Sequence, residues 1–162
     1  MDAPLPTLVL RAALGRFATG VTIVTARSGD GAAIGLTVNS FAALSLEPPL
    51  ILWSLRRSSP NLDAFRAASH FAVNVLATDQ IELARRFASP VADKFAAGDW
   101  ARGLDGVPVL GGCVAVLECE QESNQVVGDH LLFIGRIQRV AESARAPLVF
   151  LAGRYRTLGE AL

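Results

Sequence analysis

The chain has 162 residues, of which 51% are apolar and 19% are charged, which is typical of a globular domain and excludes a disordered chain. Its 15 basic and 15 acidic residues balance, so the totals show no footprint of binding to nucleic acid or to an anionic membrane. The apolar runs fall far short of the ~20 residues of a membrane-spanning helix, and the N-terminal segment lacks the basic start of a secretory signal.

The first part of the chain predicts a helix followed by strands. Residues 7–20 place Leu14 and Phe17 at helical spacing, with Thr7 positioned as the cap and Gly20 near the end. Beyond the helix, β-branched residues predict strands, and a turn rich in Gly and Asp at 28–33 joins the first two into a hairpin. A Pro-Pro pair then marks a break before the third strand. The expected strands are residues 20–27, 34–44 and 50–55.

The second part predicts helices, a long connection and more strands. A short helix is expected after the RRSSPN turn, and another over 79–87 with Asp79 as its N-cap. Residues 88–108 carry Gly, Pro and Asp at short intervals and predict an irregular connection, which at this length is more often functional than idle. Within it, Lys94 and Trp100 either close over a ligand or fix the loop. The remaining expected strands are residues 70–77, 113–125, 128–141 and 147–158.

Together these elements predict a mainly β fold. Six or seven strands joined mostly by hairpins, with two or three helices, indicate an antiparallel barrel with peripheral helices. Neither a repeat nor a low-complexity linker divides the sequence, so we expect one domain over residues 1–162. The phenylalanines expected in its core are Phe17, Phe41, Phe65, Phe71 and Phe87.

Two polar stretches are candidate binding sites. Thr37, Asn39 and Ser40 interrupt an apolar segment, and they either hold a ligand or satisfy backbone groups at the barrel rim. The RRSS turn at 56–59 combines two cations with two hydroxyls, and it either binds a phosphate or is a solvated basic turn.

The chain has two histidines and two cysteines that bear on its chemistry. His70 precedes an apolar strand without an evident partner, which favours a structural or surface role. His130 follows Asp129 in a Gly-Asp-His tripeptide, where it is either a site residue oriented by Asp129 or part of a loop cap. No metal-ligand spacing is present, so we expect no metal. Cys113 and Cys119 are interpreted as free thiols in a reducing cytoplasm.

The fragments also occur in a specific order. Over about residues 14–155 the chain contains GVTIVT, GLTVNSFAALSLEPPL, SSPN, FAVNVL, a helix ending in ARRF, DKF, GDHLLFIGRI and GRY. This set resembles the flavin reductase family, the small NAD(P)H:flavin oxidoreductases that partner two-component monooxygenases. The resemblance implies an FMN-binding split β-barrel, antiparallel and Greek-key-like, and usually a homodimer.

The resemblance also implies two adjoining binding sites. An FMN or FAD ring would lie along residues 35–40, and the phosphate would reach the SSPN turn, with Lys94 adding charge. The implied flavin contacts are Gly35, Leu36, Thr37, Val38, Asn39, Ser40, Ser54, Leu55, Arg56, Ser59, Asn61, Arg86 and Phe87. NADH or NADPH would contact Asp129, His130, Gly153, Arg154 and Tyr155, with His130 as the catalytic residue that positions the nicotinamide.

The implied activity is hydride transfer from C4 of NADH or NADPH to N5 of the flavin, followed by delivery of reduced flavin to a separate monooxygenase. Such a step needs no strong protein acid or base, which agrees with the sparse set of catalytic side chains. Two alternatives stay open: a split-barrel flavoprotein that keeps FMN bound and acts on its own substrate, and a non-catalytic binder of flavin or haem. The GDH and GRY segments argue against the second, because a pure flavin binder needs no nicotinamide site.

Overall fold

The computed structural model describes residues 5–162 of the chain. Residues 1–4, which the predicted domain over 1–162 and the N-terminal segment both include, lie outside the described residues. Among those described, no helix is both long and apolar enough to span a bilayer. The same residues hold no group of three or more His, Cys, Asp or Glu side chains placed to bind a metal ion.

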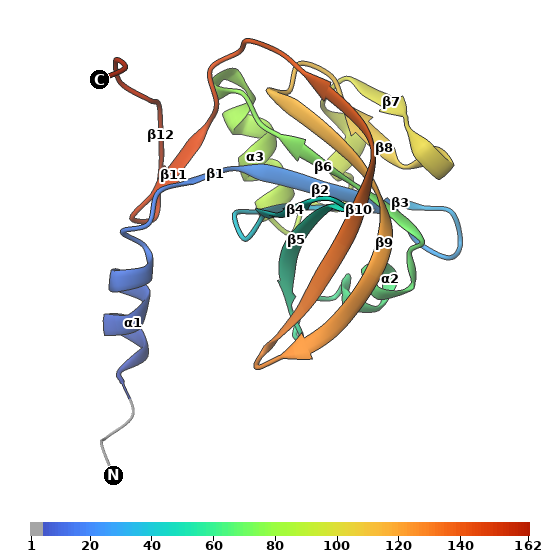
Figure 1. Cartoon of the computed structure of the whole chain (residues 1–162), viewed down its shortest axis with the longest axis horizontal. Coiled ribbons are helices and arrows are strands. Elements are labelled where there is room, and N and C mark those ends of the chain that lie inside the picture. Colours follow the sequence, from blue (N-terminus) through green and yellow to red (C-terminus); the bar gives the residue numbers. More distant parts are fainter. Residues whose placement is uncertain (1–4) are drawn as a thin grey trace.

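One curled sheet makes up most of the structure (Figure 1). Its seven strands lie in the order β3-β2-β6-β9-β10-β5-β4, and every pairing is antiparallel. After the β4–β5 hairpin the chain returns to place β6 beside β2, a connection of the Greek-key kind. The strands are β2 (Thr22–Arg27), β3 (Ala33–Val38), β4 (Ala42–Leu46), β5 (Pro49–Arg56), β6 (His70–Val75), β9 (Ala115–Val127) and β10 (His130–Glu142).

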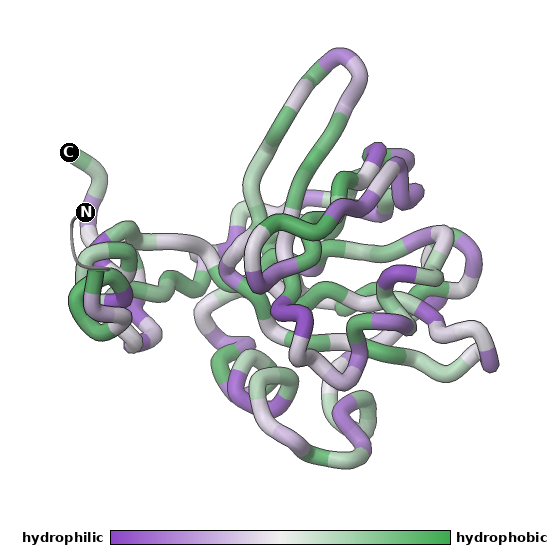
Figure 2. Tube along the Cα trace, turned by 90° about the horizontal axis from the view of Figure 1, so that it is seen from below, coloured by the Kyte–Doolittle hydropathy of each residue, from purple (hydrophilic) through white to green (hydrophobic). Residues whose placement is uncertain are grey.

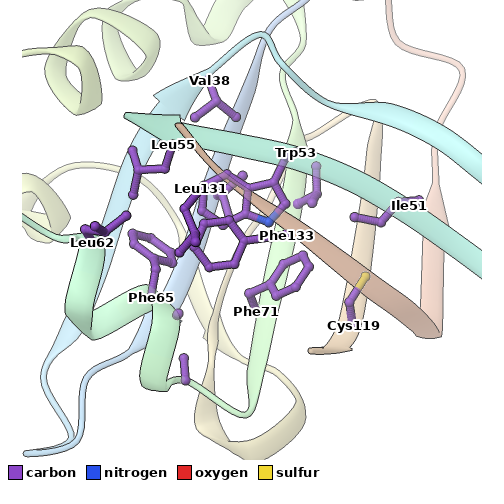
Figure 3. Close-up of a cluster of buried hydrophobic side chains, with 14 residues drawn as sticks. Val38, Ile51, Trp53, Leu55, Leu62, Phe65, Phe71, Cys119, Leu131 and Phe133 are labelled. Atoms are coloured by element: carbon purple, nitrogen blue, oxygen red, sulfur yellow. The ribbon is translucent and has the colours of Figure 1, made fainter. Parts of the chain in front are cut away.

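The inner face of this sheet holds the main core (Figure 3). Trp53 of β5 is fully buried and stacks on Phe133 of β10 with ring centroids 4.3 Å apart and planes 7° apart. Phe65 and Phe71 meet the same indole edge-on at 5.2 and 5.8 Å. Aromatic side chains bury large apolar areas and favour offset or edge contacts, so this cluster holds neighbouring strands at a fixed distance. The predicted barrel core is therefore present inside the curl.

Helices lie outside the sheet, as predicted. Helix α2 (Leu62–Ala67) buries Leu62 and Phe65 against the core. The 3-10 helix η1 (Thr78–Gln80) leads into α3 (Ile81–Ala88), which packs Ala84 and Phe87 on a second core cluster. The predicted cap at Asp79 is wrong, because the side chain of Gln80 instead accepts a hydrogen bond from the backbone N–H of Ala77 at 3.0 Å.

The connection at 88–108 is more regular than its sequence predicts. It contains two 3-10 turns, η2 (Lys94–Ala96) and η3 (Leu104–Gly106), and a small hairpin of β7 (Trp100–Arg102) and β8 (Pro108–Leu110). Such three-residue strands are too short to give a periodic signal. The fully buried Asn74 ties β8 to the barrel: its amide donates to the carbonyl of Ile23 at 2.9 Å and accepts from the N–H of Leu110 at 2.8 Å.

Segments near the two ends of the chain together form an arm that projects from the barrel (Figures 1 and 2). It consists of α1 (Thr7–Leu14) and a sheet of β1 (Thr19–Gly20), β11 (Val149–Leu151) and β12 (Arg154–Arg156) in the order β1-β11-β12. Four predictions fail here. Pro6, and not the predicted Thr7, is at the N-cap of α1, and no side chain caps the helix. The helix ends at residue 14 because 19–20 pair with β11, Phe17 is 79% exposed instead of buried, and 147–158 form a hairpin that turns through Ala152 and Gly153, both with positive φ.

The two cysteines are free and buried. Burial raises the pKa of the Cys113 thiol to about 11 and that of Cys119 to about 12. Because the thiolate is the reactive form, both groups are inert near neutral pH. That both are free agrees with their interpretation from the sequence.

Replacing Asn74 tests the tie between β8 and the barrel. Asn74→Ala leaves the carbonyl of Ile23 and the N–H of Leu110 without their side-chain partner in the interior, which costs about 3 kcal/mol of unfolding free energy. Asn124→Ala, at a half-buried position of β9, is the control and should change stability by less than about 0.5 kcal/mol. Urea unfolding measures both, and equal effects would contradict the role given to Asn74.

Candidate active site

A cleft of about 520 Å³ opens beside the edge strand β3. We call it the central cleft. A cavity of this size lies within the range that binds small molecules and cofactors. It is lined by Leu36, Thr37, Val38, Asn39, Ser40, Ser54, Leu55, Arg56, Ser58, Ser59, Ala88 and His130. The sequence assigns most of these residues to a flavin site, and the fold brings them together from β3, the end of β5, the turn after it and the start of β10.

Two further cavities adjoin the central cleft. The loop cavity, of about 510 Å³, is lined by Ala33, Ile34, Gly35, Pro60, Asn61, Pro90, Val91, Ala92, Asp93, Lys94 and Phe95. The aromatic cavity, of about 190 Å³, is lined by Val21, Thr37, Val38, Asn39, Ala88, Phe150 and Tyr155. The first shares no lining residue with the central cleft, although its Gly35 and Pro60 are next in sequence to Leu36 and Ser59 of the cleft. The second shares part of the wall of the central cleft.

Hydroxyl groups at the central cleft hold its walls together. Thr37 donates a hydrogen bond to the carbonyl of Ala84 in α3 at 2.6 Å. The hydroxyl of Ser40 lies 3.0 Å from both the N–H and the carbonyl of Ser54, and it therefore joins the end of β3 to β5. These bonds correspond to the rim alternative in the sequence analysis. Asn39 is exposed, and no hydrogen bond joins its side chain to another described residue.

The basic turn lies at one side of the central cleft. The N–H of Arg57 donates to the carbonyl of Asp129 at 2.9 Å, which fixes the turn against the β9–β10 hairpin. The N–H of Asn61 donates to the hydroxyl of Ser59 at 3.3 Å. Arg56 is exposed and lines the cleft together with Ser58 and Ser59. A guanidinium and two hydroxyls in this arrangement suit a phosphate group.

His130 and Asp129 form a pair at the mouth of the central cleft. The Nδ1 atom of His130 lies 2.7 Å from a carboxylate oxygen of Asp129, and the His130 side chain is 36% exposed. The hydrogen bond with His130 and the charge of its ring lower the pKa of Asp129. An ionised carboxylate only accepts hydrogen bonds, so Asp129 keeps a proton on Nδ1 and leaves Nε2 available for a ligand.

Arg86 and Phe87 line none of the walls of the central cleft. Arg86 donates from Nε to the carbonyl of Lys94 at 2.9 Å and from Nη2 to that of Asp93. Phe87 is buried and packs edge-on against Phe95, with ring centroids 5.1 Å apart. The ammonium of Lys94 donates to the carbonyl of Phe87 at 3.0 Å, and burial lowers its pKa. These groups fix the loop at 88–98 to the C-terminus of α3, where cations are favourable.

Of the predicted nicotinamide residues in the arm, one lines a cavity and two do not. Tyr155 lines the aromatic cavity, whereas Gly153 and Arg154 are exposed at the β11–β12 turn and line none of the three cavities. The sequence analysis missed Phe150, which is paired with Tyr155 across the hairpin at a centroid distance of 5.4 Å. It also missed Ala88, a small residue at a helix end that carries no signal of a site. Ser58 was recognised only as part of the RRSS turn.

His70 lies outside this region. Its Nδ1 atom is 3.0 Å from the hydroxyl of Ser69 and 3.5 Å from the carboxylate of Asp105. These contacts join β6 to the turn η3, so the histidine has a structural setting. The partner that the sequence did not reveal is Asp105.

Comparison with known proteins places this chain in a family. Residues 14–159 match the family model described as a flavin reductase like domain. The chain belongs to this family. The flavin reductase-like fold agrees with the predicted mainly β split barrel with few helices, which is confirmed.

Individual relatives support the assignment. The chain is 45% identical to "FMN reductase (NADH) SmoA" of Agrobacterium fabrum over 90% of this chain and 82% of that protein. It is 40% identical to "Flavin-dependent trigonelline monooxygenase, reductase component" of Acinetobacter baylyi over 97% of this chain. The chain spans about half the length of this second relative, 51%. The solved structure of the NADH:FAD oxidoreductase SgcE6 of Streptomyces globisporus, in complex with NAD and FAD fragments, matches with a TM-score of 0.88 and 36% identity, over 94% of this chain and 92% of that one.

Replacing Gly35 tests the contact of β3 with α3. A Cβ at Gly35 would lie 2.8 Å from a ring carbon of Phe87 and 3.2 Å from one of Phe95. Gly35→Ala is therefore expected to displace these rings and to cost about 1–3 kcal/mol of stability. Gly29→Ala is the matched control, since a Cβ there meets nothing within 4 Å. Thermal unfolding compares the two variants, and a Gly35→Ala protein as stable as the control would show that the contact is soft.

Proposed function

We propose that this protein is an NAD(P)H-dependent flavin reductase that supplies reduced flavin to a separate monooxygenase. The observation that carries the proposal is that most of the flavin residues expected from sequence line one cleft together with His130, although Gly35, Asn61, Arg86 and Phe87 do not. The relatives named for NADH and for FMN or FAD support the same pair of substrates. A hydride, carrying two electrons, passes from C4 of the reduced nicotinamide to N5 of the flavin, and the oxidised nicotinamide leaves.

The described residues fit a flavin by their chemistry. Because β3 is an edge strand, its backbone donors and acceptors on the side away from β2 have no strand partner among the described residues. These groups suit the polar pyrimidine end of a flavin, while Leu36 and Val38 supply apolar contact. Arg56, with the hydroxyls of the basic turn, suits the flavin phosphate.

The nicotinamide is proposed to enter between His130 and the aromatic cavity. The Nε2 atom of His130, left available by the bond between Nδ1 and Asp129, is suited to hold a polar group of the donor. Phe150 and Tyr155 supply an apolar wall on the other side of Thr37 and Val38. The protein then acts by orienting two rings and excluding water, without a strong acid or base.

We further propose that the active protein is a cytoplasmic homodimer built through the arm. Helix α1 has no buried residue, and its apolar side chains Leu8, Val9 and Leu14 are 79%, 58% and 66% exposed. The neighbouring Phe17 is 79% exposed. Several large exposed apolar side chains on one projecting segment are typical of an interface, and a second copy of the chain is the occupant we infer.

Replacing His130 tests its role in positioning the donor. His130→Ala should lower kcat/KM for NADH by about tenfold, because the group that orients the nicotinamide is lost. His70→Ala, whose ring is bound to Ser69 and Asp105, should leave the value unchanged. NADH oxidation is followed at its absorbance maximum with FMN or FAD present. If the rate and the KM of His130→Ala both equal those of the unmodified protein, His130 has no such role.

The dimer is tested by charge on the arm. Leu8→Asp and Leu14→Asp should convert the dimer to a monomer in sedimentation velocity, because an unpaired carboxylate is costly in an apolar interface. Val140→Asp, at another exposed apolar position, is the matched control and should leave the dimer intact. A protein that sediments as a monomer before any change would refute the dimer.

A further inference from the structure

The central cleft and the aromatic cavity have part of their walls in common. The first has a volume of about 520 Å³ and the second of about 190 Å³. Because they share lining residues, the two spaces adjoin at those residues, which mark the junction between them. The shared lining residues are Thr37, Val38, Asn39 and Ala88.

Ala88 differs from the other three in coming from another element. Thr37 and Val38 end strand β3, and Asn39 follows directly, whereas Ala88 is the last residue of α3. The residue is exposed, and its side chain is a single methyl group. The junction therefore has the end of β3 as one wall and this methyl group as the other.

The backbone at Ala88 is fixed relative to β3. Thr37 donates to the carbonyl of Ala84 at 2.6 Å, which ties the strand to the helix one turn before Ala88. The helix ends at Ala88 because Ser89, which precedes a proline, is extended with φ −100° and ψ 166°. The hydroxyl of Ser89 donates to the carbonyl of Arg86 at 2.8 Å, which holds the last turn. The size of the side chain at position 88 therefore decides how wide the junction is.

Under the proposed function, two rings have to meet at this junction. The flavin is proposed to lie in the central cleft, and the nicotinamide against Phe150 and Tyr155 in the aromatic cavity. Hydride transfer requires the donor C4 and the acceptor N5 to lie about 3–3.5 Å apart. A larger side chain at position 88 would stand between the rings, while the groups that hold the flavin phosphate at the basic turn would be unaffected.

From this geometry we propose that Ala88 is a specificity-determining residue whose small side chain admits the dihydronicotinamide ring to the flavin. The inference rests on the proposed reductase function and deepens it. Ala88 supplies no polar group and no proton. Its contribution is the space in which the donor ring approaches the acceptor ring, and it is separate from the affinity of the protein for flavin.

The test replaces Ala88 by side chains of increasing size. Ala88→Ser is close in size to the original residue and should keep kcat/KM for NADH within about twofold. Ala88→Leu adds three carbon atoms and should lower kcat/KM by about a hundredfold, the effect of displacing reacting groups by about 1 Å. Ala88→Val should lie between them. The loss should appear in kcat at saturating flavin, because the ring is kept from reacting.

Flavin affinity separates this role from a general loss of the site. The Kd values of FMN and FAD, measured by isothermal titration calorimetry, should stay within about threefold of those of the unmodified protein in every Ala88 variant. The matched control is Ala67→Leu, which makes the same change at the exposed last residue of α2. It should alter neither kcat/KM nor either Kd.

Each result decides between the roles. If Ala88→Leu and Ala88→Val are as active as Ala67→Leu, or if their activity falls only as far as their flavin affinity, the inference is overturned and the reductase function stands. Equal losses in Ala88→Ser and Ala88→Leu would also refute it, because the site would not respond to size. If the unmodified protein oxidises neither NADH nor NADPH with FMN or FAD, the proposed function fails and the inference fails with it.

Discussion

The contact between the edge strand β3 and helix α3 fixes the position of the central cleft. β3 pairs with β2 on one side only, and α3 holds it from outside through the bond from Thr37 to Ala84 and through the packing of Phe87 against Gly35. Since no side chain intervenes at Gly35, the aromatic ring lies directly on the strand. The strand is thus held without a second strand partner, which leaves its free backbone edge for a ligand.

Cations that sequence reasoning assigns to a ligand here bind the protein itself. Arg86 and Lys94 join the end of α3 to the loop at 88–98: Arg86 donates to carbonyls of the loop, and Lys94 donates to the carbonyl of Phe87 near the negative end of the helix. The exposed Arg56 at the basic turn is the guanidinium that lines the central cleft. Burial and existing partners therefore distinguish the two structural cations from Arg56, where residue type does not.

The sequence predicts most barrel strands, because β5 and β10 alternate over one buried face and β-branched residues mark β2, which is buried along nearly its whole length. The strand predicted at 34–44 is divided into β3 and β4. The sequence also predicts the cleft through Leu36 to Ser40 and the basic turn, whose polar groups stand out in an apolar stretch. The prediction from sequence fails where a feature depends on contacts between segments that are distant in the chain. The β7–β8 hairpin is too short to be periodic, Phe17 is apolar but exposed on the arm, and Ala88 and Phe150 reach the cavities only because α3 and the arm bring them there.

The small sheet of the arm links the N-terminal segment of the chain to the aromatic cavity. β11 lies between β1 and β12, so its Phe150 is held partly by pairing of Thr19 and Gly20 with the strand. Phe150 and Tyr155 form the wall of the aromatic cavity. Removing Thr19 and Gly20, or fusing a tag directly before them, would therefore loosen the wall of the aromatic cavity, more than a hundred residues away in sequence.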